Sequence, residues 1–196
     1  MKNPLFLLAL APAVLLSGCI SFGAKPPPSL LTLTAASPAP VGQTETATPD
    51  HTMTVNVPVV PQELAVQRVP VQASDTSLAY VKDAQWVEPP NKLFARLLAD
   101  TITAKTDWVV LGSEQSRVDP GTQLSGELRS FGIDATRNEA VVTYDAALLR
   151  SGASSVEKHR FEARVPVSQI AAGPAGVALN QAANQVAGEV ADWLGK

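Results

Sequence analysis

The sequence predicts an α+β fold, with a single mostly antiparallel sheet and two helices packed on one face. Two stretches carry apolar residues at three- and four-residue intervals, which is the spacing of a half-buried helix. Three later stretches alternate apolar and polar residues, which is the spacing of half-buried strands. The chain has 196 residues, enough to bury one substantial core.

The first half of the chain contains several strand candidates separated by proline-rich loops. Residues 30–34 and 78–87 are rich in apolar residues, and residues 53–59 alternate with period two. Pro58 places the last of these near a strand end or at a sheet edge. We expect residues 37–51 to form a loop, and residues 61–77 to be extended despite Pro61 and Pro70.

The first helix is expected directly after Glu88–Asn91. Pro90 forces the residue before it into an extended shape, and Asn91 can cap the helix. One apolar stripe follows, made of Leu93, Phe94, Leu97, Leu98 and Ile102. Residues 108–111 predict a short buried strand, and residues 119–121 predict a turn.

Three long antiparallel strands are expected after this turn, with alternating residues from Leu124 to Val165. The apolar alternation of Leu124 and Leu128 slips by one residue at Phe131, which predicts a β-bulge near Ser130. Residues 136–139 predict a hairpin turn. Among the carboxylates near it, Asp134, Glu139 and Asp145, we expect ordinary strand-face charges. The inner faces are expected to carry Val142, Tyr144, Ala146, Leu148, Phe161, Ala163 and Val165.

The closing helix is expected from about Val177 to Leu194, after the breaker Gly173–Gly176. One side carries the larger apolar residues, and small alanines allow a close approach to the sheet. The expected inward residues are Leu179, Ala183, Val186, Val190, Trp193 and Leu194.

The N-terminus has the layout of a secretory signal. Lys2 precedes an apolar run, Leu5–Leu16, and two small residues follow it. The run is too short to span a bilayer as a helix. Leu16–Cys19 resembles the lipobox of bacterial lipoproteins, which implies diacylglyceryl and acyl modification of Cys19, the one cysteine. The alternative is a plain exported protein with an incidental cysteine.

The resemblance to lipoproteins divides the chain into three parts. Residues 1–18 would be a lipoprotein signal peptide, residues 19–29 the lipidated cysteine with a proline-rich spacer, and residues 30–196 the folded domain. In Gram-negative lipoproteins an aspartate after the cysteine favours the inner membrane. Ile20 stands there instead, which implies the outer membrane, facing the periplasm.

The residues contain no recognisable catalytic or ligand-binding motif. His51 and His159 are the two histidines, and neither has partners at metal-ligand spacing. We therefore expect no metal, no cofactor and no enzyme. Without Lys2 the mature chain has 14 basic and 18 acidic side chains, which argues against nucleic-acid binding. Trp86 is interpreted as a core residue at the helix start, with ligand contact as the alternative.

These features together resemble the ABC-type transport auxiliary lipoproteins, specifically the PqiC-like, membrane integrity-associated group. The resemblance covers nearly all of the mature chain. Two departures are Leu30-Leu31, where relatives often have aromatics, and Val87, where they have alanine. The motifs that carry it are the lipobox, Leu31–Leu33, Pro61–Leu64, Trp86–Pro89, Leu128 with Phe131, and Trp193-Leu194.

The resemblance implies a non-catalytic lipoprotein, anchored in the outer membrane through Cys19, that serves an intermembrane transporter of lipid or other hydrophobic cargo. The implied partners are an MCE-domain subunit and an ABC permease with its ATPase, or a Pqi-like membrane protein. The alternatives are a periplasmic lipid-binding carrier and an outer-membrane assembly chaperone. A carrier would need an apolar cavity of several hundred Å³, whereas an adaptor should have a filled core.

A sheet covered on one face leaves the other face to water or to a partner. We expect Arg129, Arg160, Glu162 and Arg164 on that face as partner-binding residues. We also expect the strand 53–59 to form a sheet edge that accepts a neighbouring chain. Self-association into a homo-oligomer is a further hypothesis.

Overall fold

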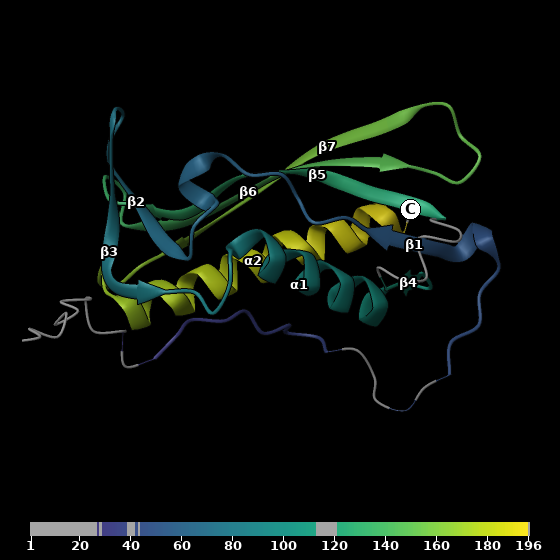
Figure 1. Ribbon diagram of the computed structural model, residues 1–196, viewed down its shortest axis with the longest axis horizontal. Helices are drawn as coiled ribbons and strands as arrows, with labels where there is room; N and C mark the ends of the chain where they lie inside the picture. Colours follow the sequence, from purple (N-terminus) through teal and green to yellow (C-terminus); the bar gives the residue numbers. More distant parts are fainter. Residues whose placement is uncertain (1–26, 28, 39–41, 43, 113–120, 196) are drawn as a thin grey trace, which may run out of the picture.

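The computed structural model describes residue 27, residues 29–38, residue 42, residues 44–112 and residues 121–195. Within this part of the chain, a seven-stranded sheet packs against two α-helices (Figure 1). The strands are β1 (Thr52–Val55), β2 (Arg68–Ser74), β3 (Ser77–Gln85), β4 (Val109–Leu111), β5 (Thr122–Asp134), β6 (Glu139–Leu149) and β7 (Val156–Pro166). The helices are α1 (Pro90–Lys105) and α2 (Ala172–Leu194), and short 3-10 turns cover Pro49–His51 and Gln62–Leu64.

Strand β5 is the centre of the sheet. Along one edge it pairs antiparallel with β6, which pairs antiparallel with β7. Its other edge pairs in parallel with β1 near its start and with β2 near its end. β4 joins β1 in parallel, and β3 joins β2 in antiparallel fashion. The described sheet is therefore mixed, and the expectation of a mostly antiparallel sheet was wrong although the α+β class holds.

The parallel pairs have a topological cause. β1 and β2 both precede α1 in the chain, and β4 and β5 both follow it. A parallel neighbour requires a crossover connection, and α1 lies in that crossover. Period-two patterns indicate which face of a strand is buried but not the direction of its neighbour. The sequence pattern therefore could not distinguish parallel from antiparallel pairing.

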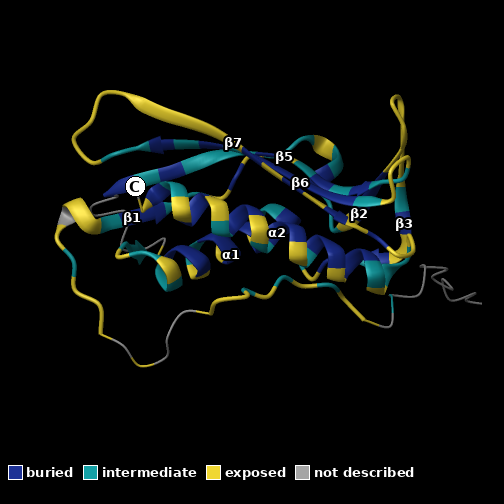
Figure 2. Ribbon diagram, turned by 180° about the vertical axis from the view of Figure 1, so that it is seen from behind, coloured by how far each residue is buried: buried dark blue, intermediate teal, exposed yellow. Residues whose placement is uncertain are grey.

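Both helices lie on the same side of the sheet, next to each other (Figures 1 and 2). The stripe predicted on α1 is buried from Leu93 to Ile102. The helix begins at Pro90, so Asn91 is not its cap. The Asn91 side chain instead donates to the Pro58 carbonyl at 3.1 Å.

Helix α2 begins at Ala172, five residues before the predicted start at Val177. Gly173 and Pro174, interpreted as breakers, lie in its first turn. Proline is tolerated there because the first backbone N–H groups of a helix have no intrahelical acceptor. The additional turn lengthens the helix toward β3, with which it is in contact.

Aromatic rings fill the space between helices and sheet. Trp86 is fully buried and meets Phe131 edge-on at 5.4 Å between ring centroids. Phe94 meets Tyr144 at 5.3 Å and Phe131 at 6.4 Å. The core interpretation of Trp86 is confirmed.

A register shift between Leu128 and Ser130 confirms the predicted bulge in β5. Arg129 is the extra residue, and its side chain is exposed. Earlier in β5, Gly126 must be glycine because a Cβ atom there would lie 2.2 Å from the Asp145 carbonyl oxygen. The Tyr144 ring covers this glycine, and its hydroxyl donates to the Ser125 carbonyl at 2.9 Å.

Other local expectations also changed. Residues 30–34 do not form a regular strand, although Leu31 makes an isolated bridge to Trp86. β1 lies between β4 and β5, and Val59 bridges to Glu127. The predicted free edge at residues 53–59 was therefore wrong. β4 is half-buried rather than buried. Residues 119 and 120 of the predicted turn lie outside the described residues.

Candidate functional site

The sheet face opposite the helices carries a network of paired charges on β5, β6 and β7. We call this surface the open face. At its centre Arg160 donates two hydrogen bonds to the Asp145 carboxylate, at 2.5 and 2.7 Å. Asp145 and Arg160 are cross-strand partners in the β6–β7 ladder. Arg129 approaches the same carboxylate at 3.6 Å and donates to Glu127 at 3.3 Å. The bulge in β5 thus brings Arg129 into the network.

A second group of charges lies nearer the β5–β6 turn. Arg164 donates to Glu162 at 2.8 Å and to Glu139 at 3.5 Å. It also lies 3.6 Å from Asp134. Glu162 in turn accepts a hydrogen bond from the Thr143 hydroxyl at 2.9 Å. The arginines and carboxylates of the open face therefore hold one another in fixed positions.

Hydrogen bonds lower the pKa of two carboxyl groups in this network. The bidentate contact with Arg160 holds the pKa of Asp145 below its usual value, against a smaller opposing effect of burial. The hydrogen bond from the Thr136 hydroxyl does the same for the pKa of Asp134. A carboxyl whose pKa is lowered by folding stabilises the fold above its unfolded pKa, which is about 3.9 for aspartate. That stabilisation disappears as the pH falls through the lower folded pKa.

Acidification should therefore destabilise the protein in part through Asp145. We expect Asp145→Asn to lower the unfolding temperature at pH 6 and to reduce the further drop between pH 5 and pH 2. Thermal unfolding followed by circular dichroism at several pH values measures both effects. An identical pH profile in the variant and the wild type would contradict the role given to this carboxylate.

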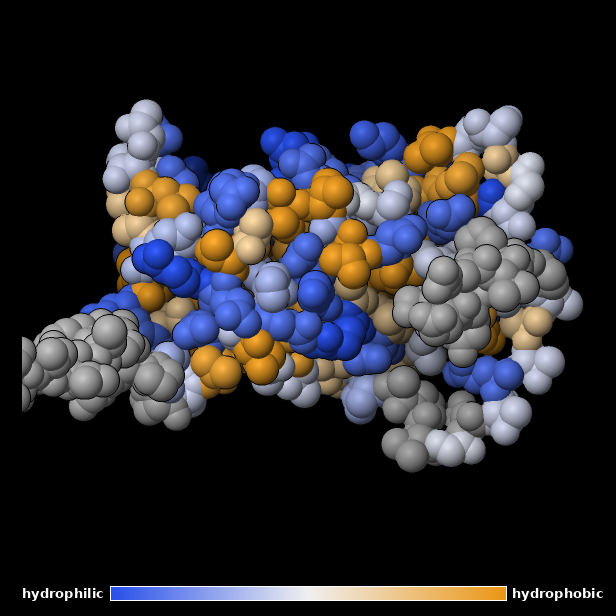
Figure 3. Space-filling model, in the orientation of Figure 1, coloured by the Kyte–Doolittle hydropathy of each residue, from blue (hydrophilic) through white to orange (hydrophobic). Residues whose placement is uncertain are grey.

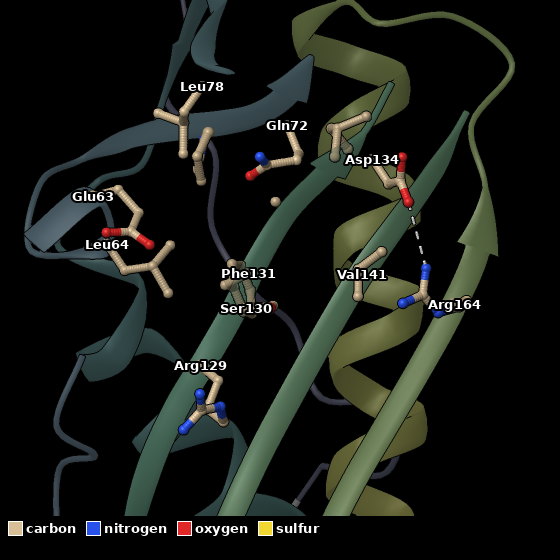
Figure 4. Close-up of a pocket in the computed structure, with 13 residues that line it drawn as sticks. Glu63, Leu64, Gln72, Leu78, Arg129, Ser130, Phe131, Asp134, Val141 and Arg164 are labelled. Carbon is tan, nitrogen blue, oxygen red and sulfur yellow. Dashed lines mark ion pairs between the residues drawn. The ribbon is translucent and has the colours of Figure 1, made fainter. Parts of the chain in front are cut away.

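A pocket of about 190 Å³ opens beside the network, where the β2–β3 hairpin approaches β5 (Figure 4). Leu78 and Gln72 extend from the hairpin, and Glu63 and Leu64 come from the 3-10 turn before β2. The far wall includes Arg129, Phe131, Asp134, Val141 and Arg164. The pocket is thus lined by apolar residues and by charges of both signs.

A second depression, of about 460 Å³, is lined by Asp145, Ala146, Lys158, His159 and Arg160. Charged residues line both depressions, whereas a lipid carrier needs a predominantly apolar cavity.

The chain enters the domain through a strap, residues 31–36, that runs along α2 (Figure 1). Asn180 accepts a hydrogen bond from the Thr34 backbone N–H at 2.9 Å, and Asn184 accepts one from Ala36 at 2.7 Å. The Asn184 side chain also donates to the Thr34 carbonyl. Because Asn180 and Asn184 are four residues apart, they lie on one face of the helix.

Asn184→Ala removes two of the hydrogen bonds that hold the strap. Each hydrogen bond contributes about 0.5–1.5 kcal/mol net, so the loss of two should make local opening easier by about 1–3 kcal/mol. We expect amide exchange at Ala36 to be at least about fivefold faster, with no change in the α2 interior. Hydrogen exchange by NMR measures this, with the exposed Gln181→Ala as the matched control. Unchanged exchange at Ala36 would show that the asparagine does not hold the strap.

The structure places the four predicted docking residues together. Arg129, Arg160, Glu162 and Arg164 are all exposed on the open face. Whether they bind a partner stays a prediction, and Cys19 lies outside the described residues. The sequence analysis named Asp134, Glu139 and Asp145 as strand-face charges but did not predict their pairing with the arginines, because cross-strand pairing depends on register. It also missed Asn180 and Asn184, although two asparagines at four-residue spacing inside a helix are a signal, since asparagine is a weak helix former.

The two histidines of the sequence each lie beside a tryptophan ring. His159 stacks at 6.0 Å on Trp193, and His51 lies against Trp108. No cluster of potential metal ligands occurs among the described residues. No helix in the described part of the chain is long and apolar enough to cross a membrane.

Comparison with solved structures supports the fold. Protein XCC0632 from Xanthomonas campestris, of the DUF330 family, superposes with a TM-score of 0.70 at 18% identity, covering 85% of this chain and 94% of its own. An uncharacterized protein gives a TM-score of 0.64 at 17% identity, covering 85% of this chain and 99% of its own. These identities establish a similar fold alone. No curated protein sequence matches the chain.

The family assignment comes from the sequence itself. The family model described as "ABC-type transport auxiliary lipoprotein component" matches residues 31–191. This range starts at the strap and ends at residue 191, so it includes the whole described sheet, α1 and all but the last three residues of α2. The chain therefore belongs to the family of ABC-type transport auxiliary lipoprotein components.

Proposed function

We propose that this protein is a non-catalytic docking component of an intermembrane transporter for lipid or other hydrophobic cargo. Residues 1–18 act as its signal peptide, and lipidated Cys19 with residues 20–29 tethers the domain to the outer membrane, facing the periplasm. The folded domain then binds the MCE-domain subunit of a system driven by an ABC permease and ATPase or by a Pqi-like membrane protein.

One observation supports docking over lipid carriage. The space between helices and sheet is occupied by Trp86, Phe94, Phe131 and Tyr144, all almost completely buried. The accessible chemistry lies instead on the open face, where Asp145, Arg160 and their neighbours are fixed by mutual pairing. A preorganised charged surface favours specific protein recognition, because its side chains lose little freedom on binding.

The test is charge reversal on the open face. We expect Arg160→Glu with Arg164→Glu to weaken binding of the purified MCE-domain subunit by about tenfold or more, because both sites then repel the partner's complementary charges. Surface plasmon resonance at two salt concentrations measures the affinity. Arg150→Glu is the matched control, since Arg150 makes a comparable surface ion pair with Glu157 beyond the end of β6.

Charge reversal also breaks the ion pairs within the open face. A second variant therefore separates repulsion of the partner from the loss of these ion pairs. Exchanging the pair, Asp145→Arg with Arg160→Asp, keeps an ion pair while moving each charge to the neighbouring strand. If the folded reversal variant binds like wild type, the open face is not the docking surface. Weakening by both variants, with Arg150→Glu unaffected, supports it.

A further inference from the structure

The pocket beside the open face opens where the chain before β2 leaves the edge of β5. Val59 bridges to Glu127 near the middle of β5, and β2 joins β5 only near its end. Between these two points the chain forms the 3-10 turn Gln62–Leu64. Residues of this turn line one wall of the pocket of about 190 Å³, and residues 129–134 of β5 line another.

The 3-10 turn fixes Glu63 at the pocket wall. The Leu64 N–H donates to the Pro61 carbonyl at 3.0 Å, and the Leu64 side chain is buried in the core. Because Leu64 is anchored in this way, the residue before it has little freedom to move. Figure 4 shows Glu63 and Leu64 on the wall opposite Val141 and Arg164.

Glu63 carries the one unpaired charge among the four charged residues that line the pocket. Arg129 pairs with Glu127, and Arg164 pairs with Asp134. Glu63 is half-buried and forms no ion pair or hydrogen bond with any residue that the structure describes. The two arginines are therefore neutralised within the protein, and the pocket keeps one uncompensated negative charge. A partly desolvated carboxylate of this kind favours a cation beside it.

Apolar side chains form most of the remaining lining. Leu78 of β3 is 40% exposed although it lines the pocket, and Pro70 and Val141 complete this part of the wall. Hydrophobic side chains lie on the β2–β3 hairpin just below its more polar tip (Figure 3, upper left). Pockets for drug-sized ligands occupy roughly 300–1,000 Å³, so this smaller pocket suits a single side chain.

One class of side chain matches both features of the pocket. Lysine and arginine carry an apolar stem below a charged head, and they bury the stem along apolar surface. An acidic side chain would be repelled by Glu63, and a purely apolar one would bury Glu63 without a partner.

We propose that this pocket receives one lysine or arginine side chain of the transporter subunit that docks on the open face. The stem packs against Leu78 and Val141, and the charged head pairs with Glu63. This inference rests on the proposed function, because the pocket shares Asp134 and Arg164 with the charge network of the open face. Side chains that fill such pockets carry much of the binding energy in protein interfaces.

The first test removes the charge of Glu63 and keeps its shape. We expect Glu63→Gln to weaken binding of the purified MCE-domain subunit to the Cys19→Ser protein by about tenfold, and Glu63→Lys by more. Isothermal calorimetry measures the affinity, and circular dichroism verifies that each variant is folded. Glu189→Gln is the matched control, because Glu189 is an exposed carboxylate on α2, on the side of the sheet away from the open face.

A second variant fills the pocket without changing any charge. Leu78→Trp places a larger side chain in the pocket wall, and we expect it to weaken binding by at least about fivefold. Ala79→Trp is the matched control. Ala79 is the next residue of β3 and is also exposed, but its side chain lies on the other face of the strand and does not line the pocket.

The outcomes separate this inference from the proposed function. Wild-type affinity of both Glu63→Gln and Leu78→Trp, with weaker binding after reversal of Arg160 and Arg164, overturns the inference and leaves the docking surface in place. Weakening by only one of the two variants also overturns it, because a basic side chain in the pocket needs both the carboxylate and the space. If Glu63→Gln alters the mass of the protein alone in analytical ultracentrifugation and not its affinity for the subunit, the occupant is a second copy of this chain and the inference is wrong. Absence of wild-type binding removes the proposed function and the inference with it.

Discussion

Replacement of Cys19 by serine is expected to move this protein almost completely from the membrane fraction to the soluble periplasmic fraction. The apolar stretch before Cys19 is too short to span a bilayer as a helix. Acyl chains stabilise membrane attachment by about 0.8 kcal/mol per buried methylene, so several chains make it effectively permanent. We therefore expect the lipidated protein to stay in the membrane fraction and the Cys19→Ser protein to leave it.

Fractionation and blotting measure this effect. The variant should carry an ordinary secretory signal in place of residues 1–18, so that an uncleaved signal cannot hold it in the membrane. The control is the wild-type protein with its own residues 1–18 and Cys19. Persistent sedimentation of the Cys19→Ser protein with outer membranes would contradict the lipid anchor.

Phe94→Ala is expected to lower the free energy of unfolding by about 3–5 kcal/mol, the usual cost of removing a buried phenylalanine side chain. Phe94 is fully buried and touches both Tyr144 and Phe131 edge-on. Its removal leaves a cavity between α1 and the sheet that neither ring can fill without moving. Leu98 is also fully buried. Its replacement by alanine should lower the free energy of unfolding by about 2–5 kcal/mol.

Urea denaturation followed by tryptophan fluorescence measures these stabilities. Val177→Ala is the matched control, since Val177 is 71% exposed and surface substitutions usually change stability by less than about 0.5 kcal/mol. If Phe94→Ala and Val177→Ala had the same denaturation midpoint, the described packing of α1 against the sheet would be contradicted.

The sequence analysis succeeded where a single face of an element determines its pattern. The stripe from Leu93 to Ile102 and the alternation through Phe161 and Val165 follow from burial on one side. The bulge at Arg129 could be predicted because one extra residue shifts every later side chain to the other face.

Features that depend on contacts between distant segments could not be predicted in this way. The parallel pairing of β5 with β1 and β2 requires knowledge of the crossover through α1. The start of α2 at Ala172 was missed because glycine and proline are tolerated in a first turn. The charges of the open face were predicted as exposed residues, but the pairing of Arg160 with Asp145 and of Arg164 with Glu139 depends on the β6–β7 register.

The central claim, that the folded domain docks on a transporter subunit, is tested most directly by titrating the purified Cys19→Ser protein with a purified MCE-domain subunit. Isothermal calorimetry at low and physiological salt is the measurement. The docking account predicts saturable binding with a defined stoichiometry that weakens as the salt concentration rises, because charged groups make the contact. Absence of binding at concentrations of about 100 μM, together with stoichiometric lipid on the protein by native mass spectrometry, would contradict docking and identify a carrier instead.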